Sequence, residues 1–268
     1  MFKNFKLFDT HTHTNIEPLA SNANEIIKEC KEKSLLICVV GTDLETSKIA
    51  LEQAQTYDHV FCTIGIHPTD IYTVDVNTFI DELEALIKKD VKKKIVGIGE
   101  CGLDYYHKPF NKEDQKSFFI KQMALAKKYD LALMMHIRDA HTDAIELLNK
   151  NKNRPDRCIV HCFTDDKKYI SDYMKLGCYV SFPGVITFKN TPNNNIANLY
   201  EAIKMTEEDK ILVETDAPFL TPVPYRGKVN YPYYVYETMK KIAEVKNIPI
   251  DDACLMLKNN ALKVFKII

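Results

Sequence analysis

The sequence lacks several features that would define other classes of protein. No run approaches the roughly 20 apolar residues needed to span a bilayer. The N-terminus has neither the apolar core nor the cleavage site of a secretory signal, so we expect a cytoplasmic protein without a membrane partner. The formal net charge is only −1, which argues against a surface coated for nonspecific nucleic-acid binding. Any polyanionic substrate must therefore be held by local charges.

Paired cysteines and arginines are also scarce. The eight cysteines include no C-x-x-C pair, which predicts buried free thiols in a reducing compartment and excludes a disulfide framework. Lys and Arg total 36, but only four are arginines: Arg138, Arg154, Arg157 and Arg226. An arginine in so lysine-rich a chain suggests bidentate contact with phosphate or carboxylate, with chance drift as the alternative.

The sequence does contain a regular alternation of short apolar runs and amphipathic segments. Helical spacing is clear at residues 77–89, 113–129 and 251–265, and the asparagine-rich residues 190–195 are expected to form a loop. The predicted strands are 6–11, 35–41, 59–67, 94–100, 131–137, 158–163, 178–182 and 211–216. Apolar strands separated by helices indicate parallel pairing. No G-x-G-x-x-G follows the first strand and no Walker loop occurs, so an α/β fold of the (β/α)8 TIM-barrel type is favoured over an open doubly wound sheet. We expect one domain over residues 1–268.

Candidate metal ligands stand where these strands end. Side chains two apart on a strand share a face, so His11 and His13 of "FDTHTH" point together. In a barrel the carboxyl ends of the strands carry the active site. Similar positions hold Glu100, His136, His161 and Asp216. Six ligands exceed the three that a catalytic zinc commonly uses, which predicts two ions with Glu100 as the bridge. His59, His107 and His141 are assigned to ordinary hydrogen bonding.

These residues lie in blocks that resemble the signatures of TatD-type metal-dependent deoxyribonucleases. The blocks are "FDTHTH", "GIHP" (65–68), "GECGLDY" (99–105), "MHIRDA" (135–140), "HCFT" (161–164), "SFPGVITFK" (181–189) and "ETDAPFLTPVPYRGKVNYP" (214–232), and the likeness runs to "NALKVF" (260–265). One departure is Cys101, where many relatives have Ile. Because this side chain should face away from the metals, the departure puts little in doubt.

The resemblance implies a TIM barrel with a two-metal centre that acts on DNA, mostly from the 3′ end, with links to DNA repair. Carried onto matching positions, His11, His13, Glu100 and Asp216 would hold one ion, and Glu100, His136 and His161 the other. Family behaviour implies that Mg²⁺ or Mn²⁺ supports turnover and that Zn²⁺ can occupy purified material. Single-stranded DNA or a 3′ end is the expected partner, and a monomer is compatible with the sequence.

The chemistry of phosphodiester hydrolysis suggests roles for further residues. Asp216 is the candidate proton acceptor beside a water that the metals activate. Glu214 lies two residues before Asp216, so its side chain shares the same face of the strand. We expect it to orient a ligand or water. His67, Arg138 and Arg226 are candidates for phosphate contact, with an ion pair to Asp139 or Glu100 as the alternative for Arg138. Four aromatic residues could stack on bases, and core packing is an equal alternative for each. They are Tyr105, Tyr106, Phe188 and Tyr225.

Two other functions stay open from the sequence. A metal-dependent amide or lactone hydrolase would commonly use a carboxylated lysine where this chain has Glu100, which favours the nuclease. A metal-binding scaffold that has lost catalysis is disfavoured because all six ligands and Glu214 are present.

Overall fold

The computed structural model describes residues 2–191 and 195–267. In this part of the chain strands alternate with helices, as the sequence predicts. The strands are β1 (Leu7–Thr12), β2 (Leu35–Val40), β3 (Val60–Ile64), β4 (Ile95–Asp104), β5 (Ala132–Arg138), β6 (Cys158–Val160), β7 (Tyr179–Phe182) and β8 (Ile211–Val213). The α-helices are α1 (Ala23–Glu32), α2 (Leu44–Thr56), α3 (Val76–Lys89), α4 (Lys112–Tyr129), α5 (His141–Lys150), α6 (Ile170–Lys175), α7 (Ile196–Met205), α8 (Val235–Lys246) and α9 (Ile250–Val264). Residues 192–194 of the expected loop lie outside the described residues.

The strands follow one another in sequence order, from β1 to β8, in one sheet. Beyond β8 the chain also meets β1 again, through a parallel bridge between Thr12 and Ala217. This is the strand order of the predicted (β/α)8 barrel, and that prediction is confirmed. By its internal contacts the chain divides into two compact units, one comprising the described residues of Met1–Cys38 and His161–Ile268, the other Val39–Val160. The single domain over residues 1–268 stays a prediction.

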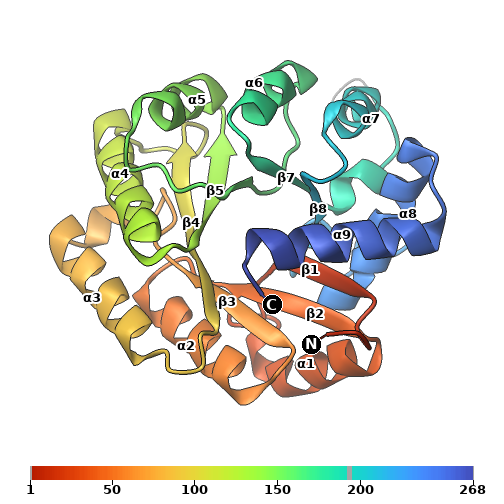
Figure 1. Cartoon of the computed structure of the whole chain (residues 1–268), viewed down its shortest axis with the longest axis horizontal. Coiled ribbons are helices and arrows are strands. Elements are labelled where there is room, and N and C mark those ends of the chain that lie inside the picture. Colours follow the sequence, from red (N-terminus) through yellow and green to blue (C-terminus); the bar gives the residue numbers. More distant parts are fainter. Residues whose placement is uncertain (1, 192–194, 268) are drawn as a thin grey trace. The chain divides into compact units, whose positions relative to one another are not determined.

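The first unit brings the two ends of the chain together. β7 pairs with β8 in parallel, with Val180 opposite Ile211. Helix α9 packs along β1 and β8 (Figure 1), and the ring of Phe8 lies 5.5 Å from that of Phe265. The last helix of the chain therefore covers the first strand, which places Phe8 in the core and its neighbours in the strand on the opposite face.

The second unit is built on β3 to β6. α2 packs on β3, α4 packs on β4, and α3 lies against both helices (Figure 1). β4 continues to Asp104, four residues past its predicted end at Glu100. The pairing of β4 with β5 shifts register between Ile98 and Cys101, so the strand resumes after a bulge. The prediction that this strand ends at Glu100 was wrong for that reason.

Two glycines permit the bulge. Gly99 and Gly102 have φ of +141° and +144°, a region that side chains disfavour. A Cβ at Gly99 would collide with the carbonyl oxygen of Met134, and a Cβ at Gly102 with that of His136. The backbone next to Glu100 can approach β5 this closely only because both positions lack a side chain.

Most of the cysteines are buried, as predicted. Six are buried, while Cys162 and Cys254 are half-buried. In the part of the chain that the structure describes, no helix combines the length and the apolar character that crossing a membrane requires.

Candidate metal centre

Three donor atoms of the first unit converge at the end of β1. His11 Nε2 lies 3.1 Å from His13 Nε2, and each nitrogen lies 3.5 Å from Asp216 Oδ1. An ion bound 2.0 to 2.2 Å from three such ligands would hold them about 3 to 3.5 Å apart. The spacing and the mixed imidazole and carboxylate chemistry of this triangle therefore fit a divalent cation.

The backbone fixes Asp216 relative to β1. Its N–H donates to the His11 carbonyl oxygen at 2.9 Å, and its φ is +55°, an uncommon conformation outside glycine that often occurs at functional sites. Burial opposes ionisation of this carboxyl, but the hydrogen bond from His13 and the charges of His11 and His161 keep its pKa below the usual range. Asp216 is thus held as a carboxylate that can bind a cation.

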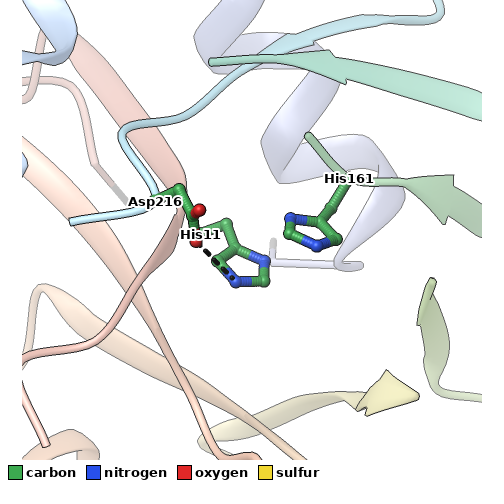
Figure 2. A group of neighbouring side chains, drawn as sticks. All are labelled: His11, His161 and Asp216. Atoms are coloured by element: carbon green, nitrogen blue, oxygen red, sulfur yellow. Dashed lines mark ion pairs between the residues drawn. The ribbon is translucent and has the colours of Figure 1, made fainter. Parts of the chain in front are cut away.

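His161 joins this group from the residue after β6. Its ring stacks on that of His11, with centroids 3.9 Å apart, and Figure 2 shows both imidazoles together with Asp216. His161 Nδ1 lies 3.3 Å from Glu214 Oε1. Glu214 is fully buried, and its Oε2 has no hydrogen-bond partner within the described chain. Because a buried acceptor normally needs a partner, this oxygen is a candidate contact for a water or an ion.

Asp9 stabilises the end of β1, where His11 and His13 lie. It is fully buried and accepts hydrogen bonds from the Thr215 amide at 2.8 Å and the Thr215 hydroxyl at 2.6 Å. Burial raises the pKa of Asp9 well above its usual range, although these hydrogen bonds oppose the change. Asp9 ties β1 to the segment that carries Asp216. Sequence reasoning gave it no role.

In the second unit, His136 and Glu100 meet. His136 Nδ1 lies 2.9 Å from Glu100 Oε1, and His67 Nε2 lies 3.6 Å from the same oxygen. The amide of Thr69 donates to His67 Nδ1 at 3.2 Å, so a neutral His67 carries its proton on Nε2, toward Glu100. Three residues predicted from separate strands thus form one cluster in this unit.

Asp104 is the member of this cluster that sequence reasoning missed. It is fully buried, and its Oδ2 lies 2.9 Å from His136 Nε2 and 2.8 Å from His107 Nδ1. Burial opposes its ionisation, but hydrogen bonds, first from His136 and then from His107, hold its pKa far below the usual range. Strand parity did not point to it, because the register of β4 shifts between Ile98 and Cys101, and Asp104 lies beyond this bulge.

The two candidate phosphate-binding arginines are exposed. The Arg138 guanidinium lies 4.1 Å from the Tyr106 ring centroid, and that of Arg226 lies 3.9 Å from the Phe188 ring centroid. Arg226 also donates to the Thr221 carbonyl oxygen at 3.3 Å. Each guanidinium is therefore oriented by an aromatic ring.

The structure thus brings the predicted residues together in two groups, one within each unit. His11, His13, His161, Glu214 and Asp216 form the group of the first unit, and His67, Glu100 and His136 form that of the second. The catalytic, metal-binding and substrate-binding roles assigned to them stay predictions.

The family model for TatD related DNase matches residues 8–266. The chain is 37% identical over 262 residues to YabD of Bacillus subtilis (strain 168), described as an uncharacterized metal-dependent hydrolase, covering 97% of this chain and 99% of that protein. It is 41% identical over 265 residues to the similarly described MG009 of Mycoplasma genitalium, covering 96% and 98%.

Solved structures show the same fold. The TatD homolog YjjV of Escherichia coli K12 superposes with a TM-score of 0.87 at 24% identity, covering 100% of both chains. A TatD family hydrolase of Entamoeba histolytica gives a TM-score of 0.83 at 20% identity, covering 97% of this chain and 98% of that one. With the family model matching nearly the whole sequence, this chain belongs to the TatD family of metal-dependent hydrolases.

Proposed function

We propose that this protein hydrolyses phosphodiester bonds of DNA, as a 3′ to 5′ exonuclease on single strands or 3′ ends, with two divalent ions. The observation that carries the proposal is the triangle of His11, His13 and Asp216, whose donor atoms lie 3.1 to 3.5 Å apart. The family description as a DNase supports the choice of substrate. Location in the cytoplasm, action as a monomer and a part in DNA repair belong to the same proposal.

The ligand sets are those that the family resemblance implies. His11, His13, Glu100 and Asp216 would hold one ion, and Glu100, His136 and His161 the other. Bound divalent cations would lower the pKa of water toward about 7 and offset charge on the phosphate oxygens. We propose Mg²⁺ or Mn²⁺ for turnover, with Zn²⁺ able to bind because imidazole suits it.

The protein's own groups would move the proton and hold the ligands. Asp216, kept ionised by its histidine neighbours, is the proposed proton acceptor. Glu214 would fix the ring of His161 through Nδ1, and Asp104 would fix His136 through Nε2. Carboxylates placed behind histidine ligands commonly orient them and increase their basicity.

Three cationic or donor groups would bind the phosphates. His67 would donate from Nε2, the nitrogen that the Thr69 contact leaves protonated. Arg138 and Arg226 each have an aromatic ring under one face of the guanidinium. This leaves the N–H groups along the edge of the guanidinium available for bidentate binding to phosphate.

The test is an end-labelled DNA assay with purified protein stripped by EDTA and reloaded with Mg²⁺, Mn²⁺ or Zn²⁺. We expect loss of cleavage on stripping, recovery with Mg²⁺ or Mn²⁺, and a drop of about 10² to 10⁴ in kcat for Asp216→Asn. Asp209→Asn is the matched control, because Asp209 is exposed and pairs with Lys263. Undiminished cleavage in EDTA would contradict the proposal.

The same assay separates the alternatives. Turnover confined to a panel of lactones would identify an amide or lactone hydrolase, and metal binding without turnover of any substrate would identify a scaffold. An RNA strand of the same sequence tests the preference for DNA. Because the net charge is −1, we expect few phosphate contacts and a shallow dependence of affinity on salt. A log–log slope as steep as about −6 would contradict that expectation.

A further inference from the structure

We propose that Phe219 is a stacking platform for an unpaired nucleobase at the proposed metal centre, which would make the enzyme selective for single-stranded ends. This inference rests on the proposed function. Phe219 stands three residues after Asp216, and its ring lies 6.4 Å from that of His13, at 67° between the planes. Its side chain is 52% exposed. A large aromatic surface is thus presented to solvent next to two of the proposed ligands.

The backbone holds this ring in place. The Phe219 amide donates to the Asp216 carbonyl oxygen at 2.8 Å. Asn230, which is fully buried, donates from Nδ2 to the carbonyl oxygens of Phe219 at 2.6 Å and Thr215 at 3.0 Å. The loop that carries Phe219 and the segment that carries Asp216 are therefore joined at fixed distances. Such support is what a binding group beside a reacting centre requires.

Other aromatic residues near the end of β8 already use a face within the protein. Tyr225 stacks on Tyr234, with ring centroids 4.0 Å apart and planes 6° from parallel. Phe188 lies under the guanidinium of Arg226. The ring of His13 meets that of Phe219 at a steep angle rather than in a parallel stack. Phe219 is therefore better suited than Tyr225 or Phe188 to receive a base.

The chemistry of the ring selects the ligand class. Phe219 offers an apolar π-face with no charge and no hydrogen-bonding group, so it favours a flat aromatic group over a phosphate. Two further apolar side chains of the same loop, Val223 and Val229, are 42% and 39% exposed. A base within a duplex is already stacked and paired, whereas an unpaired base can move onto a protein ring. Single-stranded DNA with its terminal base on Phe219 is the substrate that fits.

The experiment is a double-mutant cycle between the protein and the substrate. The variants are Phe219→Leu, which keeps apolar volume without a ring, and Phe219→Tyr, which keeps the ring. The substrates are single-stranded oligonucleotides that carry either a normal 3′-terminal residue or an abasic one, assayed with Mn²⁺. On the normal strand we expect Phe219→Leu to lower kcat/KM by about five- to 150-fold, the range for loss of one stacked base, while Phe219→Tyr retains most of it.

On the abasic strand the wild type should lose a similar factor, and Phe219→Leu should lose little more. Mn²⁺ affinity measured by calorimetry and the melting temperature should stay near wild-type values in Phe219→Leu, which separates stacking from structural damage. Equal losses on both strands, or no loss on either, would overturn the role of Phe219. A wild-type protein that cleaves no DNA would overturn the proposed function as well, so the two failures are distinguishable.

Discussion

Replacing Asp104 with Asn would test how the structure prepares His136 for a cation. Oδ1 of Asp104 accepts the amide hydrogens of Tyr106 at 2.9 Å and His107 at 2.8 Å. Oδ2 faces His136 Nε2 at 2.9 Å and His107 Nδ1 at 2.8 Å. In Asp104→Asn the amide oxygen should keep the two backbone contacts. The new NH₂ group would then take the place of Oδ2 and face two ring nitrogens.

The expected result is a change of tautomer at His136. With a carboxylate behind it, a metal-bound His136 would donate from Nε2 and present Nδ1, the nitrogen 2.9 Å from Glu100 Oε1, to the ion without a proton. An NH₂ group in that position must donate, so Nε2 becomes the acceptor and the proton moves to Nδ1. A protonated Nδ1 cannot ligate a metal. Loss of such a partner typically costs 10- to 100-fold in metal affinity, about 1.4 to 2.7 kcal/mol.

Two measurements check this prediction. Calorimetric titration of EDTA-stripped protein with Mn²⁺ gives the affinity, and long-range ¹H–¹⁵N correlation spectra of the imidazoles give the tautomer. Asp143→Asn is the matched control, because Asp143 lies in the same unit and bonds to Tyr105 and Lys116 instead of an imidazole. If Asp104→Asn binds Mn²⁺ as tightly as the wild type with His136 still protonated on Nε2, the reasoning is refuted.

Three further predictions concern the scaffold. Gly99→Ala should lower the free energy of unfolding, measured in urea, by on the order of 3 kcal/mol, because φ is +141° and a Cβ would meet the Met134 carbonyl oxygen. A loss below about 0.5 kcal/mol would contradict this, since the bulge would then relax freely. Lys94→Met should lower the free energy of unfolding by about 3 kcal/mol in the same assay, since the buried Lys94 Nζ donates to three carbonyl oxygens at 2.9 to 3.1 Å. Unchanged stability would mean that water takes the place of the ammonium group. Hydrogen bonds from Lys88, Tyr129 and Lys128 lower the pKa of Glu84 from 4.5 to about 2. Its ionisation therefore stabilises the fold above pH 4.5, and this contribution is lost as the pH falls toward 2. The stability difference between wild type and Glu84→Gln should shrink over that interval, and a difference independent of pH would contradict the assignment.

The fold could be predicted because the sequence patterns that indicate its strands and helices are local. Each strand is a short apolar run and several helices have an apolar stripe, so the element order follows largely from periodicity. The error at β4 arose at Gly99 and Gly102, because glycine normally weakens a strand. Here both glycines permit close approach to β5, and the strand continues to Asp104. Long-range pairing with β5 decided this boundary, and periodicity contains no information about it.

The proposed ligands were accessible to sequence reasoning for a different reason. His11 and His13 share a face through strand parity, and Asp216 follows a strand at the equivalent end. The residues that support them could not be found in this way. Asp104 is reached across the bulge, and Asn230 acts through hydrogen bonds to Thr215 and Phe219 from 15 and 11 residues away. The role of Asp104 depends on the bulge in β4 and that of Asn230 on loop conformation, and only the folded chain defines these.

Charge balance within the first unit gives an independent reason to expect a cation there. Glu214 is fully buried, and the Asp216 side chain is only 15% exposed. The ion pairs that the described residues form with Asp216 and Glu214 come from histidines, not from lysine or arginine. Buried carboxylates are costly unless a positive charge accompanies them, and without an ion that charge must come from protonated histidines. A divalent ion among these groups would supply the charge and leave the histidines neutral, which is the form in which they bind metals.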